Sequence, residues 1–289
     1  MTPPSSIMGQ IMHVGLYRQK GPGGGVLAAV GRTGLMAERV ETGGVPALAV
    51  WRPKDRRDPK SWEKVPVENP TWDAGGTGRT GTFAYKGRQH AATFRTPEEQ
   101  RMDLRTVADW VIRPRLLKEQ GVAEVIVLGG DRKQYQVLVN PDKLLEYGVT
   151  IQEVDQAILE NNLNASGGFT EEGHVERPVR VIARLGPQPA KVLDDLRTIP
   201  VRAGDRPVLL GQVAVIAEGP APKRGDGGID GADAVVLTVV KQPHADTRGV
   251  TDKVKAALRE SEAALPADYV VNTDLFQLKD FIDRGVYYV

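Results

Sequence analysis

Two methionines near the start of the sequence, Met8 and Met12, are the side chains best suited to metal chemistry. On an extended strand they share one face with Gln10, because side chains alternate between the two faces of a strand. Their thioether sulfurs are soft ligands that suit monovalent copper or silver. Methionine also fills irregular hydrophobic cores, and core packing explains this pair at least as well. The spacing leaves both interpretations open, a metal site and a buried strand face.

Motifs typical of enzymes do not occur elsewhere in the sequence. The four histidines are dispersed, and there is no HExxH zinc motif and no GxSxG nucleophile elbow. The segment 75–82 (GGTGRTGT) is rich in glycine like a phosphate loop, but it has no lysine, and the FAY that follows is typical of a strand rather than a helix. The absence of cysteine excludes a thiolate zinc site and a cysteine nucleophile. We therefore expect neither enzymatic activity nor a cofactor.

Charge and hydropathy exclude further classes of protein. The 289 residues carry 38 basic and 37 acidic side chains, and a net charge of +1 argues against a polybasic nucleic-acid or membrane-surface binder. Three tryptophans between residues 51 and 72 could stack on single-stranded nucleic acid, but carboxylates are interleaved with the basic residues there. No stretch approaches the ~20 apolar residues of a membrane-spanning helix, and the N-terminus lacks signal-peptide features. These observations predict a soluble chain with no nucleic-acid partner.

Residues 17–101 differ in composition from the remainder and predict an irregular, β-leaning insertion rich in glycine and proline. Four prolines between residues 53 and 70 interrupt any helix or central strand there. Short apolar runs at 26–30, 47–51 and 81–85 are typical of strands separated by turns.

The other residues predict two strand–helix–strand units. The first consists of strand 7–16, helix 103–118 and strand 122–128, and the second of strand 232–240, helix 246–265 and strand 269–273. Two such units in one sheet predict an α+β fold, a ferredoxin-like βαβ-βαβ sandwich with helices on one face only. A small α/β unit at 163–224 falls between the two halves and is therefore predicted to be inserted into the sandwich.

Strand 122–128 predicts which side of this sheet is open. Alternation places an entirely apolar set on one side of the strand and Glu124, Ile126 and Leu128 on the other. The entirely apolar set belongs under the helices, so Ile126 and Leu128 face outward. Two large apolar side chains on an open face indicate an interface or a cleft, with an edge effect or ordinary surface scatter as the alternative.

One longer motif resembles a known family. The segment 104–114 (LRTVADWVIRP), together with GVAEV at 121–125, resembles the periplasmic porter region of resistance-nodulation-division (RND) efflux transporters of the heavy-metal-cation branch. The resemblance includes SSIMGQI at 5–11 and continues in family order through KQYQV, PDKL, YGVT, ENN, PVLLGQVA, GPA, KRG, LP and FI.

The resemblance implies a domain organisation and a function. Residues 1–16, 102–162 and 225–274 would form the second N-terminal porter subdomain, and 163–224 the N-terminal part of the docking domain. Residues 275–289 would lead into a transmembrane helix, while the insertion 17–101 receives no role. The chain would be a soluble periplasmic fragment of a proton-driven inner-membrane efflux pump, forming a wall of the substrate cleft and part of the docking funnel.

The resemblance also implies partners and site residues. The partners would be the remainder of the transporter chain, the other copies in a homotrimer, a periplasmic adaptor and an outer-membrane channel. Drug-type relatives line the cleft at positions matching Ile7, Ile126 and Leu128, which are aliphatic here. The metal-binding methionines of the heavy-metal branch lie in a C-terminal half that this sequence does not include, so the exported substrate stays open. The alternative is a free-standing periplasmic ligand- or metal-binding module that uses the Ile126 and Leu128 face or the pair Met8 and Met12.

Overall fold

The computed structural model describes residues 9–42, 45–72, 79–161, 164–172, 175–182, 189–202, 207–223 and 225–287. The chain forms two compact units, a first unit of Met1–Arg132 and Pro220–Val289 and a second unit of Lys133–Gly219. Both combine helices with antiparallel strands, so the predicted α+β class is confirmed. None of the helices in the described ranges has the length and apolar character needed to span a bilayer.

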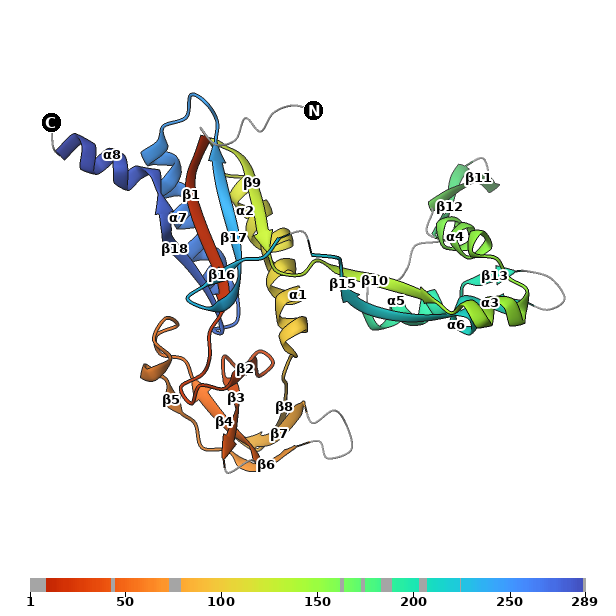
Figure 1. The fold of residues 1–289 in the computed structure, drawn as a ribbon, viewed down its shortest axis with the longest axis horizontal. Coiled ribbons are helices and arrows are strands. Elements are labelled where there is room, and N and C mark those ends of the chain that lie inside the picture. Colours follow the sequence, from red (N-terminus) through yellow and green to blue (C-terminus); the bar gives the residue numbers. More distant parts are fainter. Residues whose placement is uncertain are drawn as a thin grey trace. The chain divides into compact units, whose positions relative to one another are not determined.

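An antiparallel sheet, here called the main sheet, forms the centre of the first unit (Figure 1). Its strands are β1 (Gln10–Arg18), β9 (Val122–Gly129), β16 (Gly228–Ile229), β17 (Ala232–Lys241) and β18 (Tyr269–Gln277). β17 pairs with β1 and with β9, and β18 pairs with β1, which gives the order β9–β17–β1–β18. The short β16 pairs with the first residues of β17. The long strands are rich in β-branched residues, which suit a pleated and half-buried surface.

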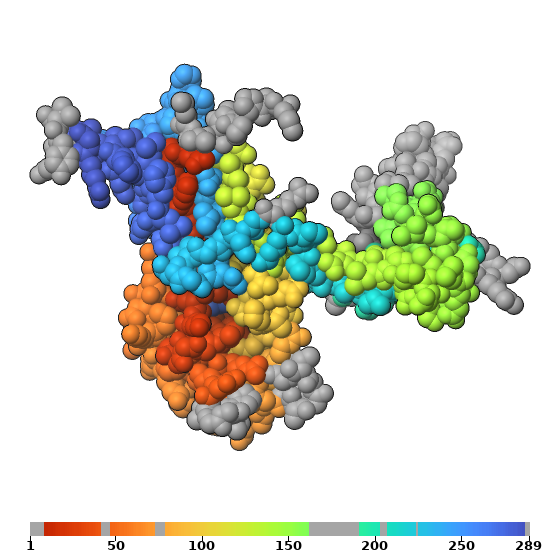
Figure 2. All heavy atoms as spheres, viewed as in Figure 1, coloured from red at the N-terminus to blue at the C-terminus, as the bar shows by residue number. Residues whose placement is uncertain are grey.

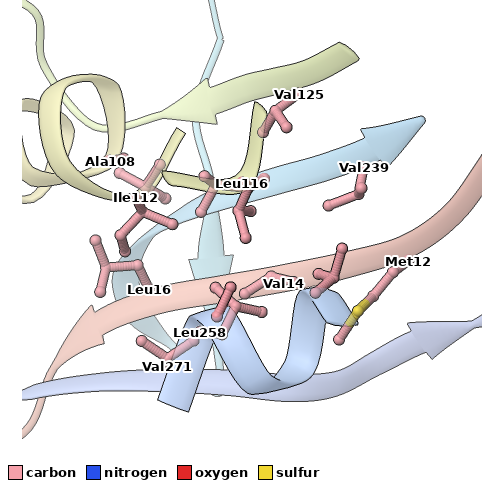
Figure 3. Packing of buried hydrophobic residues seen from close by; sticks show 14 of the residues in the cluster. Met12, Val14, Leu16, Ala108, Ile112, Leu116, Val125, Val239, Leu258 and Val271 are labelled. Atoms are coloured by element: carbon pink, nitrogen blue, oxygen red, sulfur yellow. The ribbon is translucent and has the colours of Figure 1, made fainter. Parts of the chain in front are cut away.

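Helices cover one face of the main sheet and enclose a hydrophobic core with it. They are α1 (Pro97–Val107), the π-helical turn η3 (Ala108–Ile112), α2 (Arg113–Leu117) and α7 (Thr247–Ala264), and α8 (Leu278–Tyr287) follows β18. Alternate residues of β1, Met12, Val14 and Leu16, meet Ile112 and Leu258 of the helices in this core (Figure 3).

The first helix begins before Asp103, where the sequence predicts its start. Its cap is Thr96, whose hydroxyl accepts a hydrogen bond from the backbone N–H of Glu99, while the Glu99 carboxylate accepts one from the N–H of Thr96. This reciprocal capping box satisfies N–H groups that a helix start otherwise leaves unpaired. Pro114 lies in the first turn of α2, directly after the π-helical turn.

Residues 19–96, from here on called the insertion, are more regular than the sequence predicts. One sheet consists of β2 (Val26–Ala29), β3 (Met36–Thr42), β4 (Val45–Arg52) and β5 (Glu63–Lys64), and the other of β6 (Glu68–Trp72), β7 (Thr80–Tyr85) and β8 (Arg88–Thr93); η2 (Pro59–Ser61) precedes β5. The sequence predicts β2, β4 and β7 but not β3 and β8. Phe83 is fully buried in one core cluster, and Trp72 packs against this cluster. Trp62 is buried in a smaller cluster, against which Trp51 packs. These tryptophans therefore have a structural role.

The second unit has its own core. Its elements are β10 (Lys133–Val139), α3 (Pro141–Tyr147), α4 (Ile151–Glu160), β11 (Asn164–Glu172), β12 (Val175–Ile182), α5 (Pro189–Arg197), β13 (Pro200–Arg202), β14 (Val208–Leu209), α6 (Leu210–Val213) and β15 (Ala214–Pro220). Thr150 caps α4 through a capping box with Glu153. Val154, Leu196 and Leu210 are among its buried core residues. The second compact unit begins at Lys133, whereas the family resemblance implies a porter subdomain that includes residues up to 162.

Candidate functional site

Strand register identifies the residues that lie on the face of the main sheet opposite the helices, here called the open face. One row across β9, β17, β1 and β18 consists of Ile126, Thr238, His13 and Phe276. The next row consists of Leu128, Val236, Gly15 and Asn272. Because Val14, between these rows on β1, points into the core under the helices, both rows point to the other side.

Two of the predicted site residues lie on the open face. Leu128 is 51% exposed, Ile126 is partly buried, and Val125 on the opposite side of β9 is 1% exposed. The predicted alternation holds from Glu124 to Leu128 but not at the start of the strand, where Val122 is buried in the core and Ala123 is exposed, next to a register shift in the pairing with β17. Ile7 and Met8 lie outside the described residues.

Met12 lies on the helix-covered face and is fully buried in the hydrophobic core (Figure 3). Its sulfur is packed among aliphatic side chains, which favours the packing interpretation over metal binding. Within the described ranges, no group of three or more histidine, aspartate or glutamate side chains is arranged to hold a metal ion.

An aromatic row marks the end of the open face next to α8. The ring of His13 lies 5.1 Å from that of Phe276, which lies 6.3 Å from that of Phe281, and the His13 Nε2 is 3.2 Å from the Gln10 Oε1. Phe281 is exposed. A surface that combines aromatic rings with one imidazole and one amide group is suited to noncovalent binding of a ligand.

β16 covers part of the open face at Gly15. A Cβ on Gly15 would lie 2.0 Å from the Cδ1 of Ile229 and 3.0 Å from that of Leu275, so any other residue here would displace these two side chains. Ile229 is thereby buried. The exposure of Leu128 shows that this cover does not extend to β9.

A buried ion pair that the sequence analysis missed joins β1 to the start of β18. The Nε of Arg18 donates a hydrogen bond of 2.6 Å to the Oδ2 of Asp268, whose side chain is 1% exposed. Burial raises the pKa of Asp268, and the positive charge of Arg18 opposes this shift. Burial also raises the pKa of the neighbouring Tyr269 to about 12. The paired residues are 250 positions apart, so no local pattern in the sequence could have revealed them.

Two adjacent arginines, also missed, attach the insertion to the connection between α7 and β18. Arg56 donates hydrogen bonds of 2.7 Å to the carbonyl of Leu265 and 3.1 Å to that of Pro266. Arg57 donates one of 3.1 Å to the carbonyl of Val271. These three acceptors are backbone carbonyls, which any residue type supplies, and Arg57 also donates a hydrogen bond of 3.3 Å to the carboxylate of Glu262. The pair of basic residues was therefore the only sequence signal for this attachment.

Sequence comparison relates the chain to cation efflux proteins. Residues 88–288 match the AcrB/AcrD/AcrF family. The putative cation efflux system protein SilA of Salmonella typhimurium is 31% identical over 201 residues, and the cation efflux system protein CusA of Escherichia coli (strain K12) is 30% identical over 201 residues. The nickel and cobalt resistance protein CnrA of Cupriavidus metallidurans is 30% identical over 205 residues. Each alignment covers 68% of this chain and 19% of the relative, so the chain spans about a fifth of the length of these curated relatives.

The fold of the chain is similar to parts of solved structures of a heavy metal efflux pump. A heavy metal efflux pump in one crystal form aligns with a TM-score of 0.53 and 24% identity, covering 67% of this chain and 18% of the pump chain. A second crystal form aligns with a TM-score of 0.56 and 19% identity, covering 96% of this chain and 29% of the other. At these identities the similarity is one of fold.

Proposed function

Because this chain belongs to the AcrB/AcrD/AcrF family, we propose that it is the periplasmic part of a proton-driven inner-membrane efflux pump for heavy-metal cations. The names of SilA and CusA as cation efflux proteins and of CnrA as a nickel and cobalt resistance protein support this substrate class. The relatives are transporters, and the chain is part of a transporter rather than an enzyme. Its coverage of about a fifth of these relatives supports the view that membrane-spanning parts and a C-terminal half belong to the complete pump.

The first unit without the insertion is proposed to be a ferredoxin-like porter subdomain. The strand order β9–β17–β1–β18 and the helices that connect β1 to β9 and β17 to β18 support this. The family resemblance assigns 1–16, 102–162 and 225–274 to the porter subdomain, 163–224 to the docking subdomain and 275–289 to a segment that leads towards a transmembrane helix. Of these, residues 133–162 lie in the second compact unit.

The open face is proposed to be a wall of the substrate cleft, and the exposure of Leu128 is the observation that carries this proposal. A large aliphatic side chain that is 51% exposed on the open face of β9, the edge strand of the main sheet, is expected to contact a partner surface or a ligand. Ile126 lies beside it, and Ile7 is the third proposed cleft residue. As the cleft wall, the sandwich would tilt as a rigid body during transport.

The docking role is proposed for residues 163–224, which would help form the funnel that faces the periplasmic adaptor and the outer-membrane channel. The complete pump would be a homotrimer in which the remainder of the transporter chain covers the porter subdomain. Family membership is the support for these partners.

The cleft proposal can be tested with Leu128→Asp in the complete transporter, expressed in a metal-sensitive host. A carboxylate on an apolar cleft wall would be poorly solvated when the cleft closes, so we expect host resistance to the exported metal to fall. The readout is growth across a concentration series of silver, copper, nickel, cobalt, zinc and cadmium salts.

Leu117→Asp is the matched control, because Leu117 is also an exposed leucine, at 42%, but lies in the helix layer. Immunoblotting of membranes must show equal amounts of both variants. Unchanged resistance in Leu128→Asp, or an equal fall in both variants, would contradict the role of the open face.

A metal-binding module built on Met8 and Met12 gains no support from the structure, because Met12 is fully buried. Titration of the chain with silver ions, with Met12→Leu as the comparison, tests this alternative. Saturable binding that Met12→Leu abolishes would favour it.

A further inference from the structure

The insertion contains a pocket that the export function does not explain. Its volume is about 560 Å³, and it lies between the glycine-rich loop 23–25, β3, the residues after β8 and the first turn of α1. Figure 2 shows the insertion, in red to orange, as a compact mass next to α1. The family match begins at Arg88, so most of the pocket lies outside it.

The side chains around this insertion pocket are predominantly cationic. The basic lining residues are Lys20, Arg39, Arg79 and Arg95. Glu41 is the one carboxylate among the lining residues. The apolar lining residues are Val26, Val40, Phe94 and Pro97. A concave surface with apolar parts and several positive charges is complementary to an organic anion.

The backbone N–H groups of the glycine-rich loop already have hydrogen-bond acceptors within the protein, so they are not available to bind a phosphate. The N–H groups of Gly23 and Gly25 donate to the carboxylate of Glu38 at 3.2 and 2.8 Å, and the N–H of Gly24 donates to the carbonyl of Gly21 at 2.9 Å. Glu38 is fully buried. An anion in this pocket would therefore be recognised by side chains rather than by a backbone cradle.

The glycine loop also has a fixed shape. A Cβ on Gly25 would lie 2.0 Å from the carbonyl oxygen of Arg39, and one on Gly21 would lie 2.4 Å from the carboxylate carbon of Glu38. The indole N–H of Trp51 donates to the same carboxylate at 2.7 Å. This wall of the pocket is thus formed before any ligand binds, which reduces the entropic cost of binding.

Two of the four cations are free to pair with a ligand. The Nη1 of Arg79 lies 3.0 Å from both carboxylate oxygens of Glu99, and Arg95 lies 3.5 Å from Asp103. In the described part of the chain, Lys20 and Arg39 have no carboxylate partner. The guanidinium carbon of Arg39 lies 5.6 Å from the ring centroid of Trp72, an interaction that leaves its N–H groups available.

We propose that the insertion pocket binds a small organic anion, with its acidic group held by Lys20 and Arg39 and its apolar body against Val40 and Phe94. The pocket volume lies within the range of small-molecule sites, roughly 300–1,000 Å³. A single guanidinium and a single ammonium suit one sulfonate, phosphate or carboxylate group.

Calorimetric titration of the whole chain with naphthalene-2-sulfonate tests this proposal, with uncharged naphthalene-2-methanol as the matched probe. We expect saturable 1:1 binding of the sulfonate and binding of the alcohol that is weaker by about tenfold or more, because the alcohol cannot form the charge-assisted hydrogen bonds. Lys20→Ala and Arg39→Ala should each weaken sulfonate binding by about tenfold. Glu41→Gln should strengthen it, since a like charge is removed.

Arg88→Ala is the control, because it removes the same charge from an exposed position on β8 outside the pocket. Thermal unfolding must show that each variant is folded, and the exposed Lys20 provides a test that does not disturb the sheet. Equal affinity for the alcohol, an equal loss in Arg88→Ala, or no saturable binding of the sulfonate would each overturn the proposal. Metal resistance of the complete transporter is a separate readout, so the failure of this proposal is distinguishable from the failure of the export function.

Discussion

The sandwich and the insertion lie in the same compact unit but are held together in different ways. In the sandwich, side chains from four strands and the covering helices form one continuous apolar core. The insertion has two smaller cores, and arginine hydrogen bonds attach it to the connection between α7 and β18. Periodic apolar burial builds the sandwich, while hydrogen bonds from Arg56 and Arg57 to backbone carbonyls and to the Glu262 carboxylate attach the insertion to it.

The largest effect is expected for the ion pair where the two regions meet. Arg18→Met leaves the buried Asp268 carboxylate without its partner and should lower the free energy of unfolding by about 3–5 kcal/mol at neutral pH. The measurement is urea unfolding followed by circular dichroism. A loss below about 1 kcal/mol would show that the pair is not buried as described.

The same variant has a predicted pH dependence. Burial makes the pKa of Asp268 higher in the folded protein than in the unfolded chain. The stabilisation that this carboxyl group contributes to the folded state is therefore fully present below the unfolded pKa and is lost as the pH rises through the folded pKa. Removing Arg18 raises the folded pKa further, so the difference between variant and parent should be small at acid pH and should grow towards pH 7. An equal difference at both pH values would contradict this.

In the sandwich core, Leu258→Ala should cost about 2–5 kcal/mol, because Leu258 is 1% exposed and its loss leaves a cavity. Unfolding should remain a single transition for the main sheet. Leu117→Ala, at a 42% exposed position, is the control and should change stability by about 0.5 kcal/mol or less. Equal effects of the two substitutions would show that the apolar core does not determine the stability of this region.

The attachment of the insertion gives a smaller and local effect. Arg56→Ala removes hydrogen bonds to the carbonyls of Leu265 and Pro266, each expected to contribute about 0.5–1.5 kcal/mol. Amide hydrogen exchange should increase around residues 53–62 and 265–271, while protection in β1 and β17 stays unchanged. Arg88→Ala is the charge-matched control, and increased exchange throughout the main sheet would contradict the separation of the two regions.

The smallest effect is expected at the capping box where the insertion leads into α1. Thr96→Ala should cost about 1 kcal/mol. Burial alone would raise the pKa of Glu99, but the N–H of Thr96 and the side chain of Arg79 together lower it. The stabilisation by the Glu99 carboxylate is therefore present above its unfolded pKa and is lost as the pH falls. Urea unfolding of the parent and the variant at pH 7 and pH 3 measures both effects, and a variant as stable as the parent at pH 7 would exclude the cap.

The sequence predicted those features that depend on periodicity. The outward orientation of Leu128 follows from alternation along β9, and α7 follows from its apolar stripe. The start of α1 was placed too late, because the segment TPEE with its cap at Thr96 lay inside the region taken as irregular. The pair of Arg18 with Asp268 depends on tertiary packing alone, and so does the burial of Glu38 beneath the glycine-rich loop.

The central claim, that this chain is part of a membrane transporter, is tested most directly by fractionating cells that express the native gene. An antibody against residues 102–289 would be used on immunoblots of the membrane and soluble fractions. We predict a band in the inner membrane that is several times larger than the 31.4 kDa of this chain. A soluble band at 31.4 kDa with no larger membrane species would contradict the claim and would favour a free-standing binding module.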